Sequence, residues 1–166
     1  MSAAAVLAGQ IYESQALLRL SLEHGAYGSF IGNDVQRAVR WLKRTESESS
    51  RKAVRKEFTH RNIVNHLQTI APVLAKQYEN LYEGLIDFGA HPNESGFSLN
   101  TIFEENNGNT FIRTVYLQDD GLPLNLALKT TVQVGMWVLH IMQLIYVQRF
   151  QLLGIKDALE ELRERY

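Results

Sequence analysis

The sequence predicts an all-α protein, a helical bundle of five to seven helices that carries one β-hairpin insertion at about residues 98–118. Apolar residues recur at helical spacing along most of the chain, whereas one segment combines β-branched and aromatic residues with an Asn-Gly pair. A length of 166 residues with 45% hydrophobic and 21% charged residues is typical of one globular protein, so we expect a single domain over residues 1–166.

The N-terminal part of the chain predicts two helices. Leucine and isoleucine side chains at helical spacing indicate one continuous amphipathic helix from Ala3 to about Gly32. Gly25 and Gly28 either weaken the C-terminal half of this helix or let another helix approach it closely. Asn33 is the expected N-cap of the second helix, because a Gln follows it three residues later in the capping-box pattern.

The middle of the chain predicts further helical segments. Thr45, with a Glu three residues later, is the expected cap of a polar helix that ends near Phe58. Apolar residues at positions 63, 64 and 67 continue the helical pattern. Pro72 then opens a longer helix whose expected C-terminal cap is Gly89.

A β-hairpin is predicted around the Asn107-Gly108 pair, between residues 99–105 and 109–117. Both turn residues of a tight hairpin need a positive φ, and Asn and Gly adopt it at the lowest cost. A lone two-stranded hairpin is marginally stable in water. We therefore expect the hairpin to lie on the helices or to pair with a strand of a partner.

A long apolar helix is predicted from Pro123 to about Leu153, followed by a short charged helix over residues 156–166. Residues 130–148 contain no charged side chain and, at 19 residues, just reach the length that crosses a hydrocarbon core. Three glutamines and His140 within this run would be costly in lipid, which favours a buried core helix and no membrane partner. Its second apolar face predicts a homo-oligomer, a homodimer through this helix or the hairpin.

Several function classes lack support in the sequence. The chain contains no cysteine, which excludes disulfides, thiolate metal sites and thiol nucleophiles and favours a reducing compartment. No basic residue precedes the short apolar run at the N-terminus, so we expect no signal peptide and a cytoplasmic location. Neither a Gly-x-Ser-x-Gly elbow nor a Gly-rich phosphate loop occurs, so serine-hydrolase and nucleotide-binding functions have no support.

Positive charge is concentrated in one part of the chain. Between residues 37 and 61 nine basic residues stand against three acidic ones, a local charge of +6 in a chain whose net charge is -1. A segment of this kind attracts polyanions whatever the overall charge, although an ordinary solvated helix surface has the same pattern. Helical spacing groups its arginines on shared faces, and the predicted residues for binding nucleic acid or another polyanion are Arg37, Arg40, Arg44, Arg51 and Arg55.

A candidate catalytic motif lies at the end of this basic segment. Arg61 and His66 are five residues apart, and Asn62 follows the arginine. This arrangement resembles the Arg-x4-His motif of HEPN-type ribonucleases, all-helical proteins that dimerise so that two motifs face one cleft. The resemblance implies His66 as general acid or base, Arg61 as the charge that stabilises the phosphorane, and Asn62 as an orienting group. The same spacing recurs at residues 19–24 and 55–60, and solvated or capping side chains are the alternative.

Two further groups of residues are candidate sites. Arg19, Glu23 and Tyr27 share a helix face and are expected either to order the bundle as an ion pair or to line a pocket with His91. The Glu-x-x-His pair at residues 57–60 matches half of a di-iron site in a helical bundle, but no second copy exists. We therefore expect no metal and no cofactor.

These patterns favour a small, non-catalytic, homo-oligomeric binding module whose basic face over residues 37–61 meets an anionic partner such as RNA. The alternative is a HEPN-like, metal-independent ribonuclease that uses Arg61, Asn62 and His66. Residues 17–30, 41–58 and 90–96 also resemble uncharacterised bacterial all-helical proteins, which implies an all-helical fold and a bacterial or phage source but no activity.

Overall fold

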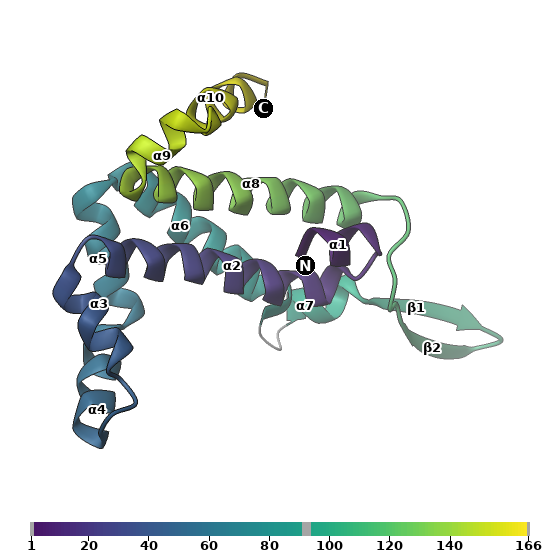
Figure 1. Cartoon of the computed structure of the whole chain (residues 1–166). Helices are drawn as coiled ribbons and strands as arrows, with labels where there is room; N and C mark the ends of the chain where they lie inside the picture. The colour runs from purple at the N-terminus through teal and green to yellow at the C-terminus, as the bar shows by residue number, and fades with distance from the viewer. Residues whose placement is uncertain (1, 91–93, 166) are drawn as a thin grey trace. The chain divides into compact units, whose positions relative to one another are not determined.

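The computed structural model describes residues 2–90 and 94–165 (Figure 1). It confirms the all-α fold with a β-hairpin insertion, because the described residues form ten α-helices, one π-helical turn and one antiparallel hairpin. The chain divides into two compact units. The first unit comprises Met1–Ser21 and Asn80–Gly135, and the second comprises Leu22–Glu79 and Met136–Tyr166.

The elements follow one another in a simple order along the chain. They are α1 (Ser2–Leu7), α2 (Ile11–Gly32), α3 (Val35–Leu42), α4 (Glu48–Glu57), α5 (His60–Ile70), α6 (Pro72–Leu85), the π turn η1 (Ile86–Ala90), α7 (Glu94–Leu99), β1 (Thr101–Asn106), β2 (Asn109–Thr114), α8 (Leu122–Ile145), α9 (Val147–Leu152) and α10 (Ile155–Arg165). Helical segments are more numerous than the five to seven expected, since two predicted helices are interrupted and the short helix α7 was not predicted.

The first interruption is at Gly9, so the prediction of one continuous helix from Ala3 to Gly32 is wrong. The backbone of Gly9 has a φ of 78°, and its carbonyl accepts a hydrogen bond of 2.8 Å from the Gln118 N–H. A Cβ atom at Gly9 would lie 2.6 Å from the Gln118 carbonyl oxygen. A long-range backbone contact therefore turns the chain between α1 and α2, where Val6 and Ile11 pack with Ala127 in the core of the first unit.

The predicted hairpin is present and lies within the expected range. Its turn residues Asn107 and Gly108 have φ values of 52° and 77°, as a tight turn requires. Phe103 pairs with Ile112, yet their side chains are 61% and 63% exposed. Every residue of β2 is exposed, and the hairpin extends away from α1 and α7 of its unit (Figure 1). The strands therefore do not pack along these helices, and the other expected arrangement, pairing with a partner strand, stays a prediction.

Helix caps in the second unit differ from two of the predicted positions. Asp34, not Asn33, caps α3, because its carboxylate accepts hydrogen bonds from the N–H groups of Gln36 and Arg37. Ser47, not Thr45, caps α4, and its hydroxyl accepts from the Ser50 N–H. In both places two residues that favour caps stand within two positions of each other, so the sequence does not separate them.

The close helix approach expected at Gly25 and Gly28 is confirmed. A Cβ atom at Gly25 would lie 3.1 Å from side-chain atoms of Trp137 and Val138, and one at Gly28 would lie 2.9 Å from Met142. Glycine at these positions lets the C-terminal half of α2 meet the C-terminal half of α8 at short distance. Trp137 is buried there, and its indole N–H donates a 2.8 Å hydrogen bond to the Leu74 carbonyl.

The second interruption lies in the predicted helix from Pro123 to Leu153, which is broken at Tyr146 between α8 and α9. Gly154, with a φ of 66°, then separates α9 from α10. On α10, Leu159 is buried, whereas Leu162 is 40% exposed. Within the parts of the chain that the structure describes, no helix combines the length and the apolar character that a membrane crossing requires.

We expect the replacement of Trp137 by alanine to lower the free energy of unfolding by about 3–5 kcal/mol, because it opens a cavity in a packed core. Equilibrium urea unfolding measures this loss. The matched control is Leu144→Ala on the same helix, where the side chain is 46% exposed and a loss below about 1 kcal/mol is expected. Equal losses in the two variants would contradict the packing of α8 described here.

Candidate functional site

An aromatic cluster around Phe58 holds the junction of α4 and α5 in the second unit. The centre of the Phe58 ring lies 4.8 Å from the centre of the Trp41 ring on α3. It lies 6.1 Å and 5.2 Å from the ring centres of Tyr27 and Phe30 on α2. The Tyr27 hydroxyl also donates a 3.1 Å hydrogen bond to the Phe58 carbonyl. Aromatic pairs at these distances attract one another beyond the burial of their surface. The cluster therefore positions α3, α4 and α5 against the C-terminal half of α2.

Glu57 is the anion around which two of the predicted anion-binding arginines gather. Arg40 donates two hydrogen bonds to the Glu57 carboxylate, of 2.7 Å and 2.6 Å, in a bidentate pair. The hydrogen bond from Arg40 holds the pKa of Glu57 below its ordinary value. Arg37 lies 3.8 Å from the same carboxylate, and its guanidinium stacks 4.1 Å from the centre of the Phe30 ring.

Of the other three predicted anion-binding arginines, two have partners within the chain and one forms no ion pair in its described part. Arg44 stacks on the Trp41 ring at 4.5 Å and donates to the Trp41 carbonyl, and Arg51 lies 3.3 Å from the Glu48 carboxylate. Arg55 is exposed and forms no ion pair with any residue that the structure describes. Four of the five predicted arginines thus already have partners within the chain.

The structure exposes a different set of positive charges on α4. Lys52, Arg55 and Lys56 are all exposed and follow the i, i+3, i+4 spacing of one helix face. We call these three residues the basic cluster. Arg61, in the first turn of the next helix, α5, is also exposed. The two lysines lie outside the set of residues predicted to bind an anion, although their spacing with Arg55 is visible in the sequence.

A second feature of this unit is a pocket of about 430 Å³, which we call the His66 pocket. Asn62 and His66, four residues apart on α5, both line it, but Arg61 does not. Arg37 supplies the positive charge at this pocket instead. The complete lining is Phe30, Arg37, Glu57, Asn62, Asn65, His66 and Thr69.

His66 is half-buried at one wall of this pocket. Its Nε2 atom lies 3.5 Å from the buried Ser29 hydroxyl, and its ring meets the Phe30 ring edge-on at 5.4 Å. Burial lowers the pKa of His66, and the positive charge of Arg37 lowers it further. A neutral imidazole is therefore favoured near pH 7, and it can accept a proton from a group in the pocket.

Asn62, the predicted orienting group, joins α4 to α5. Its side-chain amide donates a 2.8 Å hydrogen bond to the Glu57 carbonyl at the end of α4. Its backbone N–H donates to the Thr59 hydroxyl, which caps α5. Both bonds satisfy helix ends, so the capping alternative considered for this residue accounts for its position.

The remaining predicted site residues do not line the His66 pocket. Arg19 donates a 2.9 Å hydrogen bond to the Tyr82 hydroxyl, Glu23 is half-buried, and Tyr27 belongs to the aromatic cluster. His91, which was predicted to line a pocket with these three residues, lies outside the described residues.

Metal ligation has no geometric support in the described chain. Over residues 2–90 and 94–165, no three His, Asp or Glu side chains are placed to hold an ion together. Glu57 is engaged by Arg40, and the ring of His60 stacks on that of Tyr78 at 5.7 Å. The two residues of the Glu-x-x-His pair therefore contact different partners.

Comparison of the chain with protein-family models, with curated proteins and with solved structures found no match.

We expect His66 to titrate below its ordinary pKa of 6.5. Folding then favours the neutral imidazole, so the contribution of His66 to stability is complete above pH 6.5 and is lost as the pH falls through the folded pKa. NMR titration of the ring protons measures this pKa. Arg37→Gln should raise it, because a nearby positive charge is removed, whereas the same change at Arg51 should not. A wild-type pKa at or above 6.5 would contradict the burial of this ring.

Proposed function

We propose that this protein is a non-catalytic binding module that holds an anionic partner, with single-stranded RNA as the first candidate, through the basic cluster of Lys52, Arg55 and Lys56. One observation carries the proposal. The three side chains are exposed on one face of α4, and none has an ion-pair partner in the described chain. Cations in this state are available to neutralise phosphates, which releases the counterions condensed on a nucleic-acid backbone.

The pairing of nearby carboxylates supports the proposal. The two acidic residues of α4, Glu48 and Glu57, lie against Arg51 and Arg40. Their charges therefore do not offset the cluster, although they share its helix. Arg55 and Lys56 also stand in the last turn of α4, where the helix dipole favours positive charge. The dipole does not account for Lys52, which stands further from the helix end.

The first test replaces Lys52, Arg55 and Lys56 together by glutamine. We expect the affinity for a fluorescein-labelled oligouridylate to fall about tenfold or more at low salt, and the slope of log K against log salt to become shallower by about 2. Fluorescence anisotropy at several salt concentrations measures both quantities.

The matched control carries the same loss of charge elsewhere, in Lys76→Gln, Lys129→Gln and Lys156→Gln. It should retain most of the wild-type affinity and salt slope. If the two triple variants lose affinity equally, net charge rather than the basic cluster governs binding, and the proposal fails.

The HEPN-like ribonuclease is a second candidate, favoured by the presence of Asn62 and His66 in one pocket beside a positive charge. Five residues of α-helix rotate Arg61 by about 140° from His66, so the two side chains of one chain leave the helix in different directions. The shared cleft that the resemblance implies would therefore need Arg61 from a second copy of the chain.

We expect His66→Ala to lower any metal-free cleavage of single-stranded RNA by at least about a hundredfold, if His66 is the acid or base. A gel of labelled RNA with chelator present measures cleavage. The control is Gln68→Ala, an exposed residue of the same helix. Cleavage that persists in the His66 variant, or its absence in wild type, removes this candidate and leaves the binding proposal intact.

A further inference from the structure

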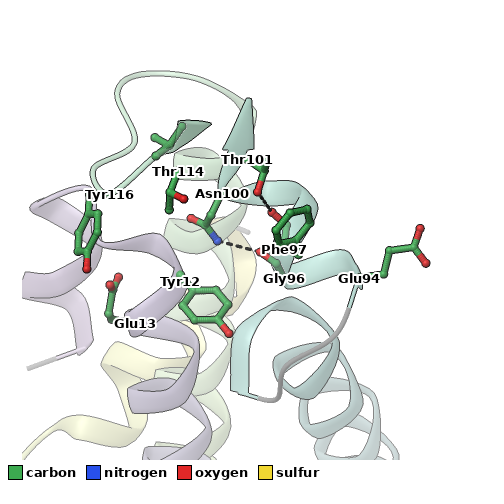
Figure 2. Close-up of a pocket in the computed structure, with 10 residues that line it drawn as sticks. Tyr12, Glu13, Glu94, Gly96, Phe97, Asn100, Thr101, Thr114 and Tyr116 are labelled. Atoms are coloured by element: carbon green, nitrogen blue, oxygen red, sulfur yellow. Dashed lines mark hydrogen bonds between the residues drawn. The ribbon is translucent and has the colours of Figure 1, made fainter. Parts of the chain in front are cut away.

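The first unit contains a pocket of about 680 Å³ that the basic cluster and the His66 pocket do not involve. It lies where the start of α2, helix α7 and the base of the hairpin meet (Figure 2). A volume of this order suits a small organic molecule and far exceeds a single metal ion. We call it the hairpin-base pocket.

Hydrogen bonds fix the wall of this pocket that α7 and the hairpin form. The Asn100 side-chain amide donates to the Gly96 carbonyl at 2.9 Å, and the Val115 N–H donates to the Asn100 carbonyl at 2.7 Å. The Thr101 hydroxyl donates to the Phe97 carbonyl at 2.8 Å, as the dashed lines in Figure 2 partly show. These bonds join α7 to β1 and join the residues that directly follow α7 and β2 to each other, so the wall is formed before any ligand binds.

Aromatic rings make up much of the lining, and several are exposed. Tyr12 is half-buried, whereas Phe97 and Tyr116 are 57% and 78% exposed. Large aromatic side chains that stay accessible around a cavity are typical of a surface that a ligand covers. Their ring faces carry partial negative charge, which attracts cations.

The charge of the lining has one sign. Among the residues that the structure describes, Glu13 and Glu94 are the ionisable side chains of the lining apart from the tyrosines, and no described Lys, Arg or His lines the pocket. In Figure 2 Glu13 is drawn between Tyr12 and Tyr116, and the hydroxyl of Tyr116 is directed toward its carboxylate. Glu94 is directed away from the other labelled side chains. Glu13 is therefore the carboxylate placed to meet a ligand.

We propose that the hairpin-base pocket binds a small organic cation, an alkylammonium or arylammonium compound. Its ammonium group meets the Glu13 carboxylate and the faces of Tyr12 and Tyr116, and its apolar part lies against Phe97 and Val115. An anionic ligand is disfavoured, because the described lining residues offer a carboxylate and ring faces but no cation to receive it.

The test compares phenethylammonium with 2-phenylethanol, which has a similar shape and no charge. Titration of the 15N-labelled protein, followed by amide NMR shifts, measures both affinities. We expect the ammonium compound to bind about three- to tenfold more tightly than the alcohol, with shifts at residues 12–13, 96–101 and 114–116. Equal affinities for the two probes, or no binding of either, would overturn the proposal.

Glu13→Gln and Glu94→Gln form a matched pair, since each removes one negative charge from a residue that lines the pocket. We expect Glu13→Gln to abolish the preference for the ammonium compound and Glu94→Gln to retain most of it. Both side chains are exposed, so neither change should disturb folding, and the NMR spectrum reports this directly. An equal loss of preference in both variants would show that general charge attraction, and not a site at Glu13, selects the cation.

Discussion

The packing of Phe58 against α2 is the contact on which the arrangement of the second unit depends. Phe58 stands between α4 and α5, and its ring lies in contact distance of Tyr27, Phe30 and Trp41. Phe30 in turn carries the stacked guanidinium of Arg37 on one side and meets the His66 ring edge-on. The same aromatic contacts therefore place the basic cluster of α4 and one wall of the His66 pocket.

Charge pairing within the helices separates structural arginines from available cations. Arg37 and Arg40 compensate Glu57, and the neutral form favoured at His66 follows from burial beside Arg37. These two arginines are paired within the unit, so little of their charge is available to a partner. A count of basic residues overstates the binding surface for this reason, because it does not distinguish a paired guanidinium from a solvated one.

Local patterns predicted the elements whose structure is decided locally. The Asn107-Gly108 turn and the helix that opens at Pro72 are where the sequence places them. The break at Gly9 depends on a hydrogen bond to Gln118, more than a hundred residues away in the chain, and no local pattern reports it.

The candidate sites also divide into features that one helix decides and features that depend on distant parts of the chain. The spacing of Asn62 and His66 was readable on one helix, whereas the partner of Arg40 lies 17 residues away on another. The sequence did not predict the hairpin-base pocket, because three separate segments of the chain line it.

The most direct test of RNA binding by the basic cluster is an NMR titration of the wild-type protein with a short oligouridylate at low and moderate salt. We expect amide shifts concentrated on α4 and the start of α5 that weaken as the salt concentration rises. Shifts confined to other elements, or none at low salt, would contradict it.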